Sequence, residues 1–413
     1  MEQYEARRIV ETLRAGVPSR EVSRILLAGR DEQLDRCKKD MNQVSVDGRS
    51  RYFLIYSAYG GGKTHFLSAL ANSALENGFA VSQLVLSKET PFNRINKVYE
   101  ATAHAVELPD YPRTGFEEAL MRIRPESDIY YDLRDDIESS LHPKLSFVFQ
   151  NYFREGDFTK RSQIYEDLAG SFFSMSTLRA IHRSNFGESI RMERFLLSQH
   201  THNYFRFLSK LIRRLGYKGW VILLDEAELL AKLGIAGRAQ AYVNLGRLFG
   251  FDVESAVDGM YVVCAFNTAF REDRLLGKNG DVHNAPGWLD KKRRNSDAEI
   301  AKRTLDALIN EGIHLPAITR DMAGGILKEL ERLHGTAYDW ETRMNRDQIL
   351  DWTGTTLTQG SVRTTILAAM EDMDVRYQEG NGQVDLYFAS PDEGTFEEDS
   401  AYFQSKDEPP DYS

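Results

Sequence analysis

Residues 57–64 read Ser-Ala-Tyr-Gly-Gly-Gly-Lys-Thr, and this stretch decides how the rest of the chain is interpreted. It matches the P-loop pattern GxxxxGK[ST], except that Ser57 stands in place of the first glycine. Consecutive glycines let the backbone curl so that its N–H groups face a phosphate, and the helix that follows adds its positive dipole end. We therefore expect Lys63 to reach the β- and γ-phosphates of ATP and the Thr64 hydroxyl to bind Mg²⁺. The residues expected to contact the nucleotide are Ala58, Tyr59, Gly60, Gly61, Gly62, Lys63, Thr64 and His65.

The flanks of this loop have the periodicity of strand, helix and strand. Residues 52–56 (YFLIY) form an apolar run too short for a helix and typical of a buried parallel strand. Residues 64–77 carry a helical apolar stripe that ends at Gly78, and residues 79–86 predict a second strand. This order indicates an α/β domain with a parallel sheet.

A second motif follows in residues 221–226, Val-Ile-Leu-Leu-Asp-Glu. An apolar strand that ends in two carboxylates is the Walker B arrangement, in which Asp225 holds Mg²⁺ and Glu226 polarises the attacking water. Unpaired carboxylates at the end of a buried strand would be costly, and a bound cation removes that cost. An acidic helix N-cap after a core strand is the structural alternative.

The adjacent glutamate indicates the P-loop group that has an extra strand between the two Walker strands. Residues 260–266 are the candidate for that strand, and Asn267 or Thr268 at its end could orient the lytic water, as sensor 1 does in AAA+ enzymes. We favour Asn267, although an ordinary turn after the strand would use the same residue. Further on, Gly-Ser-Val-Arg at 360–363 resembles the sensor 2 motif of AAA+ lids, which makes Arg363 the candidate for a γ-phosphate contact. Candidates for an arginine that reaches a neighbouring subunit's nucleotide are Arg247, Arg271 and Arg274.

The expected fold is thus an α/β, AAA+-like P-loop NTPase (ASCE) fold with a parallel sheet, a helical insertion and a C-terminal helical lid. The expected units are an N-terminal helical segment (1–50), an ATPase core (51–318) with the insertion (88–219), a lid or winged-helix-like domain (319–389) and an acidic disordered tail (390–413).

Composition limits the other function classes. The chain has 413 residues and a net charge of -10, and the tail after residue 390 holds eight acidic residues against one lysine. The nearly neutral body can therefore carry local basic faces, so DNA is a candidate partner. Two distant cysteines, Cys37 and Cys264, argue against a disulfide framework or a cysteine-rich zinc site. We expect a cytoplasmic protein without a membrane segment.

Two basic regions could contact nucleic acid. The first is Lys-Lys-Arg-Arg at 291–294, for which a solvated charge run is the commoner outcome. The second lies at 204–218, where basic residues alternate with aromatic ones and could grip a single strand. Packing of these aromatic side chains in the helical core is the alternative that we favour.

Several motifs together support a family resemblance. Their order is GRDEQ at 29–33, SAYGGGKTHFL at 57–67, SKETPFN at 87–93, VILLDEAE at 221–228 and GSVRTTI at 360–366. In this order they resemble the BREX-type ATP-binding proteins, the BrxD-like P-loop ATPases of bacterial phage defence. The resemblance implies an ATPase that works beside a helicase-like partner or other defence proteins, with DNA as the expected target. Ser57 departs from the family pattern.

From the residues themselves we expect Mg-ATP hydrolysis, with Lys63, Glu226, Asn267 and Arg363 as catalytic residues and with Thr64 and Asp225 at the metal. Two alternatives stay open. One is a nucleotide-gated binding module with little turnover, and the other is an initiator-like DNA-binding ATPase outside defence. A homo-oligomer is compatible with each of them.

Overall fold

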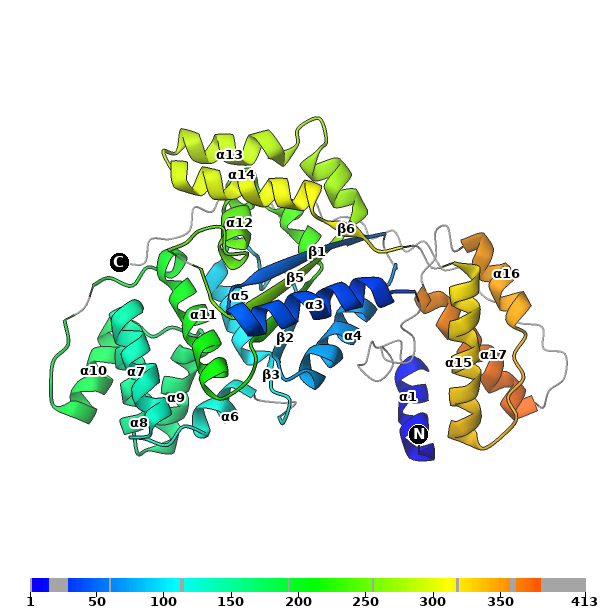
Figure 1. Ribbon diagram of the computed structural model, residues 1–413, viewed down its shortest axis with the longest axis horizontal. Coiled ribbons are helices and arrows are strands. Elements are labelled where there is room, and N and C mark those ends of the chain that lie inside the picture. Colours follow the sequence, from blue (N-terminus) through cyan, green and yellow to red (C-terminus); the bar gives the residue numbers. More distant parts are fainter. Residues whose placement is uncertain are drawn as a thin grey trace.

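A six-stranded sheet organises the molecule, with the strand order β3-β2-β4-β5-β1-β6 (Figure 1). All neighbouring strands are parallel except β2 and β3. The strands are β1 (Arg51–Ser57), β2 (Ala80–Val85), β3 (Val106–Glu107), β4 (Trp220–Asp225), β5 (Met260–Asn267) and β6 (Ile313–His314). The apolar runs predicted as strands are confirmed, whereas the two-residue edge strand β3 is too short to leave a pattern in the sequence.

The computed structural model describes residues 2–14, 29–58, 61–111, 115–191, 193–254, 256–316, 319–356 and 362–379. The acidic tail at 390–413 therefore lies outside the described residues.

The predicted extra strand is confirmed, because β5 lies between β1 and β4. The register aligns Ser57 of β1 with Asn267 of β5, and it aligns Val85 of β2 with Asp225 of β4. The carboxyl ends of these four parallel strands consequently meet at one edge of the sheet. Open α/β sheets bind their ligands at this edge.

Helices α3 (Asp31–Asp47) and α4 (Lys63–Glu76) share one apolar core with the β1, β4 and β5 side chains of one sheet face. Helix α4 forms because it has no helix breaker between Lys63 and Glu76 and places Phe66, Leu67 and Leu70 on a buried stripe. Packing of α4 beneath the sheet fixes its N-terminus directly after the glycine loop.

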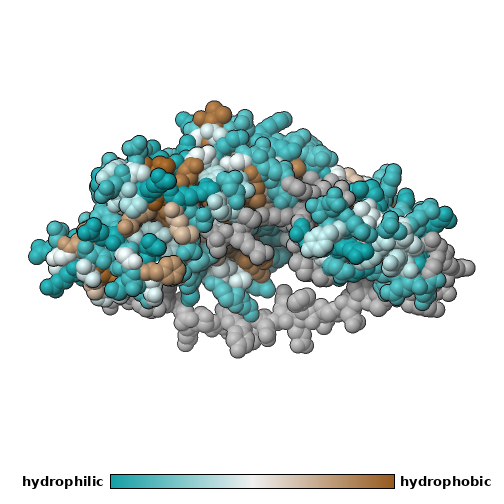
Figure 2. Space-filling model, turned by 90° about the horizontal axis from the view of Figure 1, so that it is seen from below, coloured by the Kyte–Doolittle hydropathy of each residue, from teal (hydrophilic) through white to brown (hydrophobic). Residues whose placement is uncertain are grey.

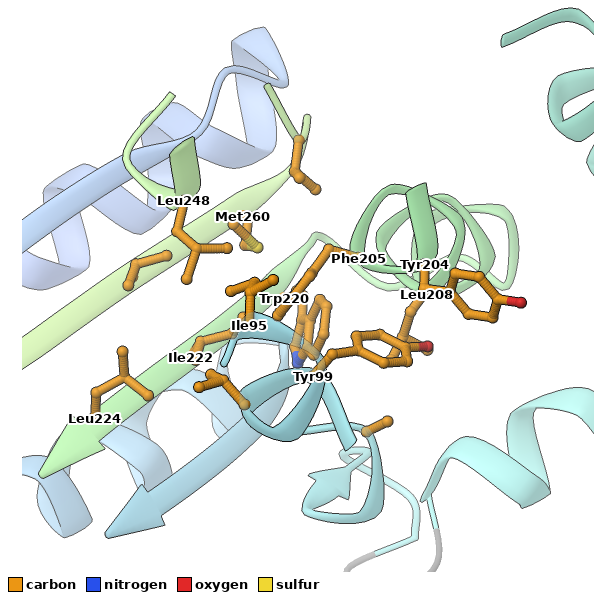
Figure 3. Close-up of a cluster of buried hydrophobic side chains, with 14 of the residues drawn as sticks. Ile95, Tyr99, Tyr204, Phe205, Leu208, Trp220, Ile222, Leu224, Leu248 and Met260 are labelled. Carbon is orange, nitrogen blue, oxygen red and sulfur yellow. The ribbon is translucent and has the colours of Figure 1, made fainter. Parts of the chain in front are cut away.

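The opposite face of the sheet is covered by a larger core (Figure 3). Trp220 of β4 is fully buried there, and its indole N–H donates to Ser82 Oγ of β2 at 3.0 Å. Figure 3 shows Phe205 and Tyr99 around this tryptophan. The helices after β4 are α12 (Ile235–Leu248), α13 (Asp281–Lys291) and α14 (Asn295–Asn310), with the short turns η1 (Ala227–Lys232) and η2 (Phe270–Leu275).

The segment between β2 and β4 is mainly helical, as the sequence predicts. Its helices are α5 (Ile95–His104), α6 (Gly115–Met121), α7 (Asp128–Ser140), α8 (Pro143–Arg154), α9 (Phe158–Leu168), α10 (Met175–Phe186) and α11 (Leu197–Arg214). The α11 aromatics Tyr204, Phe205 and Phe207 are fully buried, so they cannot stack on nucleic-acid bases. The single-strand interpretation of residues 204–218 is therefore wrong, and core packing explains these aromatics.

The first helix packs against the last ones. Helix α1 (Gln3–Arg14) shares an apolar core with α15 (Arg320–Tyr338), α16 (Arg346–Thr356) and α17 (Val362–Glu379). Arg14 Nε donates to Asp374 Oδ2 at 2.7 Å, and Arg7 Nε donates to the carbonyl of Ala337 at 2.7 Å. We call α1 with α15–α17 the terminal helical unit; Figure 1 shows it beside the sheet domain.

None of the helices in the described ranges is long and apolar enough to cross a bilayer. The face shown in Figure 2 is mostly hydrophilic, with its hydrophobic residues in small separate groups.

Candidate functional site

The glycine loop connects β1 to α4, and its last two glycines are required for different reasons. Gly62 caps α4 with φ +86°, a conformation that residues with a Cβ rarely adopt. Gly61 has no such backbone requirement, but a Cβ there would lie 2.0 Å from Ser57 Oγ and 3.1 Å from the Ala58 carbonyl oxygen. The loop is therefore packed closely against the end of β1. Tyr59 and Gly60 lie outside the described residues.

Ser57 fits the position where the pattern has glycine. It is the last residue of β1, pairs with Asn267 of β5, and is absent from the residues with positive φ. Because the backbone here is strand-like, a side chain at position 57 is sterically allowed. The departure from the pattern therefore leaves the turn intact and fills the space behind Gly61.

The P-loop and the β4 carboxylate are joined directly. Thr64 Oγ1, in the first turn of α4, donates to Asp225 Oδ2 at 2.5 Å. Asp225 is 1% exposed, and its Oδ1 accepts the backbone N–H of Glu226 at 2.9 Å. Both side chains thus present oxygen atoms to the same point at the mouth of the sheet.

Glu226 begins the turn that leaves β4 and has φ 55° and ψ 33°. A left-handed backbone is uncommon for a residue with a Cβ, and such conformations cluster at functional sites. The conformation turns the chain sharply away from the strand, so that Glu226 follows Asp225 without extending β4.

Asn267 ends β5 beside this pair, in the place that the sequence predicts. Its Oδ1 accepts the backbone N–H of Ala269 at 3.0 Å, which is the local turn contact considered as the alternative. Glu228, in η1, lies close to the backbone of Asn267.

Glu228 is a site residue that the sequence reasoning missed. Its Oε1 lies 3.7 Å from Lys63 Nζ, and the two side chains are 17% and 7% exposed respectively. Burial raises the pKa of the Glu228 carboxyl, and the charge of Lys63 opposes this rise. The sequence Asp-Glu-Ala-Glu at 225–228 contains a third carboxylate that could have been noticed.

Arg30, in the sequence before α3, also reaches the P-loop. Its Nη2 donates to the Gly61 carbonyl at 2.8 Å, and the residue is 4% exposed. Burial lowers the pKa of this guanidinium to about 10. In the sequence, the Gly-Arg-Asp-Glu stretch stands out only through its family resemblance, because nothing in it indicates a contact with residue 61.

Three buried polar atoms around the loop have no hydrogen-bond partner among the residues that the structure describes: Arg30 Nη1, His65 Nε2 and Glu228 Oε2. Buried polar groups are normally satisfied, so this local concentration is expected where a polar ligand completes the site. Burial also lowers the pKa of His65, which favours its neutral form. A nucleotide supplies both phosphate acceptors and base or ribose donors, and thus fits these residues.

The oxygen ligands fit Mg²⁺. Thr64 Oγ1 and Asp225 Oδ2 are hard donors at the end of the phosphate cradle, as Mg²⁺ prefers. Within the described ranges, no group of three or more His, Cys, Asp or Glu side chains is arranged to hold a metal on its own. A magnesium ion bound here would therefore depend on phosphate oxygens and water for its remaining ligands.

Other predicted residues have different surroundings. Arg363 is in the first turn of α17, but its side chain lies outside what the structure describes. Arg247 pairs with Asp297 at 2.9 Å, and Arg271 donates to the Ile309 carbonyl at 3.1 Å. These two arginines are thus engaged inside their own chain.

The basic run at 291–294 ends helix α13. Arg294 pairs with Asp297 at 2.7 Å and donates to Gln240 Oε1 at 2.7 Å, whereas Lys291, Lys292 and Arg293 are exposed. Part of the run therefore has a structural role, and three of its cations face solvent.

Comparison with known proteins gives one family match. The model described as "BREX system ATP-binding protein BrxC/D" matches residues 1–123 and 139–364, most of the chain. A search among curated proteins found no match. The matched ranges include Arg30, the P-loop, Asp225 through Glu228, and Arg363.

Proposed function

The chain belongs to the family of BREX system ATP-binding proteins, and from this premise we propose that it binds Mg-ATP and hydrolyses it. The observation that carries the proposal is the 2.5 Å hydrogen bond from Thr64 to Asp225. This bond joins the two halves of a Mg-ATP site, which are separated by more than 150 residues in sequence but adjoin at the carboxyl edge of the sheet. A glycine-rich turn or an acidic N-cap alone would not bring the two side chains together.

Each residue then has a defined task. The Lys63 ammonium neutralises charge on the β- and γ-phosphates, and the loop amides and the α4 N-terminus bind the phosphate oxygens. Thr64 and Asp225 hold Mg²⁺, which supplies charge stabilisation to the phosphates when bound. Glu226 accepts a hydrogen bond from the attacking water and orients it, with Asn267 beside it.

We propose that the terminal helical unit acts as the lid, with Arg363 as its γ-phosphate contact. The domain division at 51–318 and 319–389 is part of this proposal, with α1 counted together with the lid helices. Closing of such a unit over a nucleotide would couple turnover to movement, which would act on DNA or on another BREX protein. A homo-oligomer could present one of the arginines of a neighbouring copy to this site.

A nucleotide-gated module with little turnover is the second candidate function. It is favoured by Asn267, whose side-chain oxygen accepts the Ala269 N–H at 3.0 Å, the contact of an ordinary turn residue after a strand. The two functions differ in what they require of Glu226.

The deciding experiment measures ATP hydrolysis and equilibrium ATP binding for the wild type, Lys63→Ala and Glu226→Gln. An ATPase loses both properties with Lys63→Ala, and loses turnover while keeping binding with Glu226→Gln. If Glu226→Gln leaves turnover unchanged, the catalytic assignment is wrong. If wild type binds ATP without turnover, the gated module is correct.

The DNA-linked part of the proposal is tested with the same assay plus duplex or single-stranded DNA at low salt. Stimulation that is lost after charge reversal at Lys291, Lys292 and Arg293 would support DNA as an effector. If neither form of DNA changes the rate of ATP hydrolysis, the effector is instead expected to be a protein partner.

A further inference from the structure

Lys63 of the P-loop has an acidic neighbour, Glu228 of η1. Glu228 Oε1 lies 3.7 Å from Lys63 Nζ, and the lysine is 7% exposed. A buried ammonium is costly unless it has a countercharge, and of the described residues Glu228 is the one that forms an ion pair with it. The same ammonium is the group expected to reach the phosphates of ATP.

We propose that Glu228 holds Lys63 in the nucleotide-free protein, and that ATP binding exchanges this carboxylate for phosphate oxygens. This inference rests on the proposed nucleotide site. It makes Glu228 a positioning residue that competes with the nucleotide, distinct from the roles of Asp225 at the metal and Glu226 at the attacking water.

The backbone holds Glu228 in this position independently of Lys63. Glu228 lies in the first turn of η1, two residues after the left-handed Glu226, and close to the backbone of Asn267 in β5. Among the described residues, none hydrogen-bonds its second oxygen, Oε2, which is buried. The turn therefore directs the carboxylate toward Lys63, and a side chain that is only 17% exposed has little room to move away from the ammonium.

The exchange changes the charge balance around η1 and lowers the affinity for nucleotide. When Lys63 turns to phosphate, Glu228 loses its cation, so an unpaired carboxylate is left in η1, close to the end of β5. Nucleotide affinity is then lower than the P-loop alone would give, because each binding event must break the Lys63–Glu228 pair.

The test is an equilibrium titration with a fluorescent ATP analogue in the presence of Mg²⁺. Glu228→Gln keeps the size and hydrogen-bonding shape of the side chain and removes its charge, and we expect its Kd to fall about fivefold, as for loss of one partly buried competing ion pair. Glu272→Gln is the matched control, since it removes the same charge from an exposed carboxylate in η2 that has no role in the site, and its Kd should change less than about twofold.

A double-mutant cycle with Lys63→Met isolates the pair. In the Lys63→Met background, Glu228→Gln should leave the weakened affinity unchanged, because no ammonium remains to be released. Urea unfolding of the same four proteins without nucleotide gives a second readout, in which the two substitutions should be non-additive. Glu228→Asp, whose shorter side chain withdraws the carboxylate, should also lower the Kd and serves if Glu228→Gln fails to fold.

The outcomes separate the two proposals. If Lys63→Met binds nucleotide as tightly as wild type, the nucleotide site itself is wrongly assigned. If Lys63→Met loses affinity but Glu228→Gln is unchanged or weaker than wild type, the site stands and the exchange is refuted. An equal gain with Glu272→Gln would also refute it, since general negative charge would then explain the effect.

Discussion

Replacement of Gly61 by alanine tests how closely the P-loop is packed. The added Cβ would lie 2.0 Å from Ser57 Oγ, more than 1 Å inside the ordinary contact distance of about 3.4 Å, and 3.1 Å from the Ala58 carbonyl oxygen. Ser57 is 5% exposed, so its hydroxyl has little free space to enter. The overlap therefore has to be relieved by movement of the loop, which displaces amides that face the phosphates.

Overpacking of this kind costs about 1–3 kcal/mol, and we take the lower part of that range because movement of the loop relieves part of the overlap. We expect Gly61→Ala to weaken ATP binding about tenfold, equivalent to about 1.4 kcal/mol. Ser57→Ala removes the clashing atom and leaves Ser57's Cβ position at 3.4 Å from the new methyl group. The double variant should therefore recover most of the lost affinity.

Isothermal titration calorimetry with Mg-ATP on the wild type, both single variants and the double variant measures this cycle. Thermal unfolding of each protein without nucleotide checks that the fold is kept. Wild-type affinity in Gly61→Ala would show that the loop is not packed as described. A Gly61→Ala defect that Ser57→Ala leaves unchanged would show that the hydroxyl is not the cause.

Three further measurements probe the metal site, a buried ion pair and a buried histidine. Thr64→Val removes the hydroxyl that donates to Asp225 of β4 and is the expected Mg²⁺ ligand. Chelation of Mg²⁺ should therefore weaken ATP binding several-fold in the wild type and little in the variant. If calorimetric titrations show the same dependence of ATP affinity on Mg²⁺ in both proteins, the ligand assignment is contradicted. The Lys144 ammonium lies 2.9 Å from the fully buried carboxylate of Asp167. Lys144→Met leaves this carboxylate without its cation and should lower the free energy of unfolding by about 3 kcal/mol. An unchanged midpoint in urea denaturation would refute this. Burial, reinforced by the charge of Arg247, lowers the pKa of His202 from 6.5 to about 4. Between these two pH values the unfolded chain binds a proton at this histidine that the folded chain does not bind. The free energy of unfolding therefore falls as the pH drops from about 6.5 toward 4. His202→Gln should lose less stability than wild type between about pH 7 and pH 4.5, and parallel denaturation profiles would exclude this histidine as a contributor.

The strands and the P-loop helix are predictable because their signals are local. Runs such as residues 220–224 are continuously apolar, as a parallel strand buried on both faces requires, and their flanking turns limit their length. The location of the candidate site follows from the strands. Strand β1 leads into the loop before Thr64 and β4 ends at Asp225, and parallel pairing places these two ends at the same edge of the sheet. The place of β5 between β1 and β4 was also inferable, from the glutamate that follows the aspartate.

Contacts made across the fold had no such local signal. Glu228 reaches Lys63 only because the left-handed Glu226 and the tight η1 turn direct its carboxylate inward. The contact between Arg30 and Gly61 depends on where α3 begins relative to the loop. Sequence spacing reports periodicity within one element, and it does not report which elements a turn brings together.

The N-terminal helix shows the same limit. Its apolar residues Ile9, Val10 and Leu13 indicate a buried face, but an apolar stripe does not specify its partner. That partner proves to be α15–α17, more than 300 residues away in sequence, whereas α3 packs on the sheet domain. The expected segment 1–50 thus contributes to two different cores.

Because α1 belongs to the same core as α15–α17, the two ends of the described chain join in one body, and Gly29, which precedes α3, lies against α15 of that body. A Cβ on Gly29 would lie 2.2 Å from Met322 Cε, and the glycine has φ +67°. A substitution at this one position would therefore act on both bodies at once, because it would strain the backbone that leads into α3 and displace the Met322 side chain of α15.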